Sequence, residues 1–293
     1  MKNKLSLLLT LLAVPAYAAN PPSGTYLALG DSIAFGMNPL LLPPYVPVSQ
    51  VPTPDKFVGY PEAFADMTRL PAAKLVNAAC PGETSASFLN QNMPDLGCNS
   101  SHVGPPAPPF KSIGLHTPYS VSQMDFAMAK LAAVRGIDLV TLTIGANDVL
   151  MALPKIQECG TDSVCAAARL GAVLDAYAGN LVTILTGIRS RYQGTLILTK
   201  YYSPVPALDA ATVALNTTMT TVAQRLAAQP GFAPVQFADG FTAFKIASLP
   251  KGGDACAAGL LIRLTSTTCD QHPTQKGQEI LALIVFLAQL TRH

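Results

Sequence analysis

The feature that most constrains the fold of this chain is an alternation of short apolar segments with longer helical ones. Five short runs have the composition of buried strands: 26–29, 74–78, 139–144, 195–199 and 235–238. Helical patterns lie between and after them, at 61–69, 121–134, 163–191, 208–228 and 275–290. Such alternation indicates βαβ units, which build a parallel sheet covered by helices on both faces. We therefore predict an α/β fold.

Two long proline-rich segments interrupt this alternation, at 37–58 and 94–118. Proline disfavours regular helix and central strand, so both segments are expected to be loops. Long ordered loops are often functional, and these two either form walls of a substrate site or only cover the surface. Neither segment has the character of a linker, and we expect one domain.

The N-terminus has the three parts of a secretory signal peptide. Lys2 and Lys4 precede an apolar stretch at 5–14, and residues 16–18 form an Ala-x-Ala cleavage signal. Cleavage after Ala18 defines residues 1–18 as the signal peptide and 19–293 as a single domain. We expect a secreted protein, extracellular or periplasmic. The apolar part of the last helix, 280–287, is too short to span a membrane, so we expect no integral membrane segment.

The charge balance excludes some classes of partner. Of the 19 basic residues two leave with the signal peptide, and the remaining 17 balance the 17 acidic residues. A chain without net charge has no general attraction for nucleic acid or for anionic membranes. We expect no nucleic-acid partner.

Six cysteines behind a signal peptide are typical of three disulfides. Six cysteines allow fifteen pairings, and the simplest guess joins neighbours in sequence. The guessed pairs are Cys80–Cys98, Cys159–Cys165 and Cys256–Cys269. Zinc binding is the competing interpretation, but the sequence contains no Cys-x-x-Cys pair, and we expect no metal and no cofactor.

A candidate nucleophile stands at the end of the first predicted strand, where Gly30-Asp31 leads into Ser32. The carboxyl ends of parallel strands are where α/β proteins bind ligands, although serine and aspartate are also ordinary helix caps. A nucleophilic serine needs a base within hydrogen-bonding reach. Of the four histidines His272 is the best candidate, because it precedes the last helix in a turn-forming Asp-Gln-His-Pro segment. The others lie in a proline-rich loop, His102 and His116, or at the last position, His293.

Four short blocks together resemble the GDSL/SGNH hydrolases, a family named after four residues in four separated motifs. In order along the chain they are Gly-Asp-Ser at 30–32, Asn-Ala-Ala-Cys-Pro-Gly-Glu-Thr at 77–84, Gly-Ala-Asn-Asp at 145–148 and Asp-Gln-His-Pro at 270–273. The resemblance implies a three-layer α/β/α sandwich with a mostly parallel five-stranded sheet, which is a flavodoxin-like arrangement. The chain also resembles the secreted bacterial esterases and lipases of this family that have three short-range disulfides.

The resemblance also implies the site residues. Ser32 is the expected nucleophile and His272 its base. The expected oxyanion hole consists of the N–H groups of Ser32 and Gly82 and the side-chain amide of Asn147, since glycine permits close approach and asparagine carries a neutral donor. One position departs from the family: the aspartate usually found three residues before the histidine is replaced by Cys269. Either Asp270 or a backbone carbonyl near Cys269 therefore orients His272.

These expectations lead to an enzyme, a carboxylic ester hydrolase that acts through an acyl-enzyme. The substrate is a small-molecule or lipid ester, and the apolar segment 37–58 suits a fatty-acyl ester. The first alternative is an acetyl esterase acting on polysaccharide, although the chain has no Trp of the kind common in sugar sites. The second is a surface-binding module without catalysis, since fold alone does not establish activity. We expect a monomer.

Overall fold

The structure, a computed structural model, describes residues 24–100 and 108–291 of the chain. The signal-peptide prediction, His102 and His293 lie outside these residues. At the centre is a parallel sheet in the order β2-β1-β3-β4-β5. The five strands have the bounds Thr25–Gly30 (β1), Leu75–Asn77 (β2), Ile137–Thr143 (β3), Thr195–Lys200 (β4) and Gln236–Asp239 (β5). Each lies within two residues of an expected strand, and the predicted sheet is confirmed.

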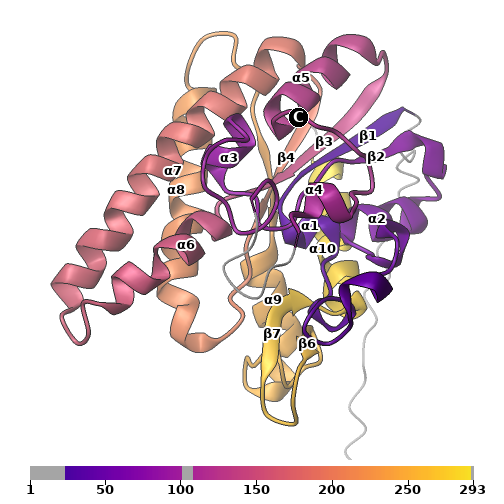
Figure 1. The fold of residues 1–293 in the computed structure, drawn as a ribbon. Coiled ribbons are helices and arrows are strands. Elements are labelled where there is room, and N and C mark those ends of the chain that lie inside the picture. Colours follow the sequence, from indigo (N-terminus) through magenta and orange to yellow (C-terminus); the bar gives the residue numbers. More distant parts are fainter. Residues whose placement is uncertain (1–23, 101–107, 292–293) are drawn as a thin grey trace, which may run out of the picture.

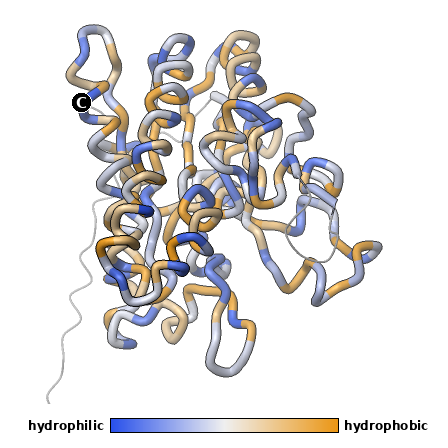
Figure 2. The backbone as a smooth tube through the Cα atoms, turned by 60° about the vertical axis from the view of Figure 1, so that its left-hand side comes forward, coloured by the Kyte–Doolittle hydropathy of each residue, from blue (hydrophilic) through white to orange (hydrophobic). Residues whose placement is uncertain are grey.

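Helices cover both faces of this sheet (Figure 1). One layer consists of α2 (Tyr60–Thr68), α9 (Gly240–Ser248) and α10 (Gln275–Leu290). The other consists of α3 (Ser85–Leu89), α5 (Gln123–Ala133), α7 (Ser163–Arg191) and α8 (Asp209–Ala227), with α6 (Ala146–Gln157) packed on α7. Figure 2 shows apolar and polar residues mixed along these outer helices, as expected where one face of a helix packs inward. The three-layer α/β/α arrangement is therefore confirmed.

The longest helix, α7, meets the length and composition of a membrane-crossing segment. In the structure it instead packs against α3, α5, α6 and α8. Its inward side chains Tyr177, Leu181, Ile184 and Leu185 are fully buried. An apolar stripe of this kind is what a core helix of an α/β domain requires.

The short elements lie around the carboxyl edge of the sheet. They are α1 (Ser32–Phe35), α4 (Phe110–Ile113) and an antiparallel pair formed by β6 (Leu261–Arg263) and β7 (Cys269–Pro273). The segment 37–58 forms three single 3-10 turns, at Pro39–Leu41, Val48–Gln50 and Pro54–Lys56. The segment 270–273 was expected to be a turn, and it is instead a strand of a separate small ladder.

Three disulfides join the cysteines as guessed: Cys80–Cys98, Cys159–Cys165 and Cys256–Cys269. The first closes the segment that follows β2, and the third ties the loop after α9 to the start of β7. The middle one joins the end of α6 to the start of α7. Two of the three therefore brace the segments that carry Gly82 and His272.

Candidate active site

The turn between β1 and α1 sets the position of Ser32. Gly30 has a φ of 134°, and a Cβ atom there would lie 2.1 Å from the carbonyl oxygen of Thr143 in the neighbouring strand. Only glycine therefore fits so close to β3. Asp31 caps α1 by accepting a hydrogen bond of 3.0 Å from the N–H of Ile33. Ser32 is consequently the first residue of a helix that starts at the carboxyl edge of the sheet.

Ser32 meets His272 across 240 residues of sequence. The hydroxyl Oγ of Ser32 lies 2.8 Å from Nε2 of His272, and both side chains are buried. His272 stands on β7, two residues before Thr274, whose hydroxyl caps α10. The phenol of Tyr202 donates to the carbonyl of Gln271, which fixes the preceding residue of the same strand. The imidazole is thus held where it can accept the serine proton.

Asp270 faces the other side of the imidazole. Its carboxylate oxygen Oδ1 accepts from Nδ1 of His272 and also from the backbone N–H of the same residue, the latter at 2.9 Å. Partial burial acts to raise the pKa of Asp270, but the hydrogen bonds and charge of His272 outweigh it and hold that pKa below its usual range. Of the two alternatives, the geometry therefore favours Asp270 over a backbone carbonyl.

Asn147 also lies at this site. It is the second residue of α6, and with Ser32 and His272 it lines one pocket. One hydrogen of its amide goes to the backbone carbonyl of Glu83, at 2.9 Å. The NH₂ group has a second hydrogen, which is available to a substrate. Asn147 thereby joins the start of α6 to the loop that follows Gly82.

Gly82 occupies a backbone conformation with a φ of 83°, and a Cβ atom there would lie 2.4 Å from the backbone of Leu96. This close packing accounts for glycine at the position. Gly82 is not among the residues that line the pocket, whereas Ser32 and Asn147 are. Its neighbour Glu83 is hydrogen-bonded to Asn147, and the role of the Gly82 N–H as a donor stays a prediction.

A partly buried carboxylate ties α3 to α6. Asp148 accepts from the backbone N–H of Ser85 at 2.9 Å and from the Ser85 hydroxyl at 2.5 Å. Asn180 on α7 donates to the same hydroxyl, at 2.9 Å. The residues just after Gly82 and just after Asn147 are thus fastened to each other.

Asp31, which precedes the nucleophile, is almost fully buried. Burial raises its pKa to about 6, against the opposing effect of hydrogen bonds from Tyr201 and Ile33 and of the nearby His272. The Tyr201 phenol donates to Asp31 Oδ2 from the end of β4. Asp31 is therefore a structural group of the serine turn whose charge varies near neutral pH.

The pocket beside Ser32 runs between α6 and α8 and is mostly apolar. Its apolar lining residues are Ile33, Ala146, Val149, Leu150, Leu153, Pro204, Leu208, Ala211 and Leu215. It holds about 750 Å³, its opening to solvent included. No lining residue in the described part of the chain comes from 37–58 or 94–118, so for this pocket the second alternative, that these loops only cover the surface, is favoured.

Some residues around the site gave no signal in the sequence. The side-chain amide of Gln123 on α5 bonds both backbone groups of Gly30, its Oε1 accepting from N at 2.5 Å and its Nε2 donating to O at 3.0 Å. His116 lies in the proline-rich segment 94–118, but it is not a solvated loop residue. It is largely buried against Phe35, and its Nε2 lies 3.0 Å from the Phe35 carbonyl. Gln123 and His116 therefore hold the backbone on either side of Ser32, at Gly30 and at Phe35.

One group of potential metal ligands occurs in the described residues, namely Cys80, Glu83 and Cys98. The two sulfur atoms are joined in a disulfide, so they cannot act as thiolate ligands. The group is therefore a disulfide beside a carboxylate.

Comparisons with known proteins agree with this geometry. A family model described as GDSL-like lipase/acylhydrolase matches residues 28–280. An extracellular lipase from Streptomyces rimosus aligns with 91% of this chain and 100% of its own, with a TM-score of 0.51 and 19% identity.

Two further structures are similar. The lipase Lip_vut3 from a goat rumen metagenome gives a TM-score of 0.50 at 17% identity, over 91% of this chain and 97% of its own. A lipolytic protein of the G-D-S-L family from Veillonella parvula gives a TM-score of 0.50 at 12% identity, over 92% of this chain and 100% of its own. At these identities the likeness shows the fold alone. No curated protein matches the chain.

Proposed function

Because the chain belongs to the GDSL-like lipase/acylhydrolase family, we propose that this hydrolase cleaves carboxylic esters through an acyl-enzyme on Ser32. The observation that carries the proposal is the hydrogen bond of 2.8 Å between Ser32 Oγ and His272 Nε2, with a carboxylate on the far side of the ring. A hydroxyl, an imidazole and a carboxylate in that order are the parts of a serine hydrolase triad. A binding module without catalysis would have no need of them.

The reaction follows from this order of groups. His272 Nε2 takes the hydroxyl proton as Ser32 Oγ attacks the ester carbonyl, and Asp270 stabilises the imidazolium. The negative charge that develops on the carbonyl oxygen is met by the N–H groups of Ser32 and Gly82 and by the amide of Asn147. His272 returns the proton to the leaving alcohol. Water, activated by the same imidazole, then releases the carboxylic acid and restores the serine.

We propose that the acyl group is a hydrocarbon chain, bound between α6 and α8. The aliphatic side chains of Val149, Leu150 and Leu153 on α6 and of Leu208 and Leu215 across the pocket support this choice. A ligand that enters such a lining gains about 0.8 kcal/mol for each methylene group removed from water. The enzyme should therefore prefer fatty-acyl esters, from small molecules or lipids, to acetyl esters.

A graded series of p-nitrophenyl esters tests this proposal. Each added methylene that reaches the pocket should raise kcat/KM by about fourfold, until the chain outgrows the space. Leu153→Phe should shorten the preferred chain, whereas Leu283→Phe on the exposed side of α10 should leave the preference unchanged. A maximum at acetate that Leu153→Phe does not alter would favour an acetyl esterase. If Ser32→Ala retained full activity, the proposed mechanism would be rejected.

We further propose that residues 1–18 are removed on secretion and that residues 19–293 act as a monomer. Three disulfides support an oxidising compartment, extracellular or periplasmic. Ser32, His272 and Asp270 all come from one chain, so a single copy supplies the whole triad. The mass of the exported protein should correspond to a chain that starts at Ala19.

A further inference from the structure

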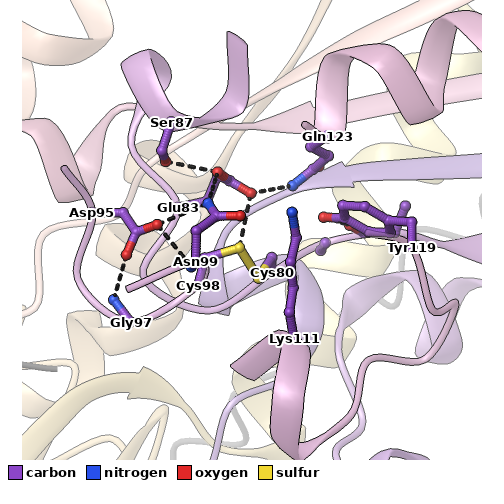
Figure 3. The surroundings of a disulfide bond; sticks show 12 residues. Cys80, Glu83, Ser87, Asp95, Gly97, Cys98, Asn99, Lys111, Tyr119 and Gln123 are labelled. Atoms are coloured by element: carbon purple, nitrogen blue, oxygen red, sulfur yellow. Dashed lines mark hydrogen bonds between the residues drawn. A yellow bond between two sulfur atoms is a disulfide. The ribbon is translucent and has the colours of Figure 1, made fainter. Parts of the chain in front are cut away.

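Glu83 carries a buried carboxylate that the proposed mechanism does not use. It directly follows Gly82, and its side chain is fully buried. Three side chains donate to it: Ser87 Oγ at 2.7 Å, Asn99 Nδ2 at 3.2 Å and Gln123 Nε2 at 3.1 Å (Figure 3). All three partners present hydrogens, so the pocket around this side chain is complementary to an ionised carboxylate.

Glu83 lies where three segments of the proposed site meet. Through its carboxylate it holds the amide of Gln123, which also bonds both backbone groups of Gly30, two residues before Ser32. Through its backbone carbonyl it accepts the amide of Asn147 at 2.9 Å. One residue therefore connects the serine turn with the start of α6.

The Cys80–Cys98 disulfide anchors the same segment. Figure 3 shows the carboxylate of Glu83 beside this disulfide, and its Oε2 lies 3.1 Å from Cys98 Sγ. The backbone N–H of Glu83 donates to the carbonyl of Cys80, and the carbonyl of Gly82 accepts from Leu96. The peptide between Gly82 and Glu83 is thus held from the backbone, from the disulfide and from the carboxylate.

The charge of Glu83 is poised near neutral pH. Burial raises its pKa to about 7, against the opposing effects of the Ser87 and Gln123 hydrogen bonds and of Lys111. The charged groups that face it are Lys111 on α4, which lowers this pKa, and Asp95 after α3, which raises it. Lys111 is itself half-buried, and its ammonium donates to the carbonyl of Val121 at 2.6 Å.

We propose that Glu83 is a positioning residue: its ionised carboxylate, through Gln123 and through its own backbone, keeps the N–H of Gly82 and the amide of Asn147 aligned with Ser32. This inference rests on the proposed ester hydrolase function. The group touches no substrate, and it acts on the oxyanion donors rather than on the nucleophile itself.

Protonation of Glu83 should weaken this alignment. A protonated carboxyl carries a hydrogen of its own, and its neighbours Ser87, Asn99 and Gln123 all point donors at it, so at least one hydrogen bond is lost. Activity should therefore rise as Glu83 loses its proton. Stability should change in the opposite direction. The folded pKa of about 7 exceeds the ordinary value of 4.5, so ionisation destabilises the fold as pH rises from 4.5 to about 7. A carboxylate with only a structural role would show the second trend alone.

Glu83→Gln tests the proposal, because glutamine has the size of the protonated acid and cannot ionise. We expect kcat for p-nitrophenyl butyrate to fall about 10- to 100-fold, the cost of misaligned oxyanion donors, while KM changes little. The acidic limb of the wild-type pH profile of kcat/KM should report the titration of Glu83 as well as that of the base, His272. In Glu83→Gln this limb should be less steep by one proton.

Glu62→Gln is the matched control. Glu62 is another largely buried glutamate, which accepts from Gly59 at 3.0 Å and from Asn77 at 2.8 Å, and burial raises its pKa as well. It has no hydrogen bond to Gly30, Gly82 or Asn147 among the described residues. Its replacement should change the melting temperature and leave kcat and the steepness of the acidic limb unaltered.

The outcomes separate this inference from the proposed function. If the wild type hydrolyses esters and Glu83→Gln retains both its kcat and its pH profile, the inference is wrong and the proposed function stands. The inference is also wrong if the acidic limb of the wild-type kcat/KM profile fits the titration of a single proton. This measurement does not depend on the folding of any variant. If the wild type hydrolyses no ester of the series, the proposed function itself fails.

Discussion

Asp270→Asn isolates the charge beside the imidazole of His272, the proposed catalytic base. In the structure one oxygen of Asp270 accepts from both the backbone N–H and Nδ1 of His272. An asparagine in the same place should keep its oxygen toward these two donors, because its NH₂ group cannot accept from the backbone N–H. The tautomer and the ring orientation should therefore survive, and only the negative charge is lost.

The magnitude follows from the electrostatics of this pair. Two unit charges about 4 Å apart interact by about 4 kcal/mol at the effective dielectric constant of about 20 that applies near a protein surface. The Asp270 side chain is 23% exposed, so solvent reduces that value. We expect the transition state to lose about 2–3 kcal/mol, a decrease in kcat of about 30- to 150-fold. Asp270→Ala also removes the acceptor that selects the tautomer, and its loss should approach the roughly 10⁴-fold that accompanies the wrong tautomer of a triad histidine.

The assay is the pH dependence of p-nitrophenyl butyrate hydrolysis by the wild type, Asp270→Asn and Asp270→Ala. Without the carboxylate charge the imidazolium is less stable, so the acidic limb of Asp270→Asn should move to lower pH. Circular dichroism should confirm that both variants are folded. A near-normal rate with an unmoved limb would refute this reasoning, and a backbone carbonyl would then be the partner of His272.

Three further predictions follow from the site. Ser32→Ala, His272→Ala and the double variant should each lose about 10⁶-fold in kcat, because triad members act as a unit, and losses that multiply would contradict the assignment. Opening the Cys80–Cys98 loop with reductant should destabilise the fold by about 3 kcal/mol, visible as a lower Tm in calorimetry, and an unchanged Tm would argue against a stabilising disulfide. Burial raises the pKa of Asp31 from 3.8 to about 6, so ionisation of Asp31 destabilises the wild type as pH rises from 3.8 to about 6. The Tm of Asp31→Asn should therefore increase relative to that of the wild type over this range, and a Tm difference that does not change with pH would contradict the prediction.

The sheet was predictable because its inner strands, β1, β3 and β4, are buried on both sides and are therefore continuous apolar runs. The central strand β3 was expected at 139–144 and begins two residues earlier, at Ile137. Helix α6 was not foreseen, since Asn147 and Asp148 are typical of loops and Pro154 interrupts the helical pattern. Polar strands are harder to predict from sequence than apolar ones. Strand β7, which contains Asp270 and His272 and pairs with β6, has no apolar alternation that would mark it as a strand.

The residues of the proposed triad could be suggested only from the four blocks taken together, and the side chains that support them could not. Gln123 reaches Gly30 across 93 residues and Glu83 across 40, and contacts of this range depend on how helices pack on the sheet. No local pattern marks a glutamine that will clamp a backbone turn. The orientation of the Asp270 side chain likewise depends on the bend of β7, which spacing to His272 does not define.

The central claim, a nucleophilic Ser32 activated by His272, is tested most directly by labelling with a fluorophosphonate, followed by peptide mass spectrometry. We expect one adduct per chain, located on Ser32, with loss of ester hydrolysis in step with labelling. The adduct should be absent in Ser32→Ala and form far more slowly in His272→Ala. An adduct on another residue that accompanies inactivation, or undiminished hydrolysis by fully labelled Ser32, would show that Ser32 is not the nucleophile.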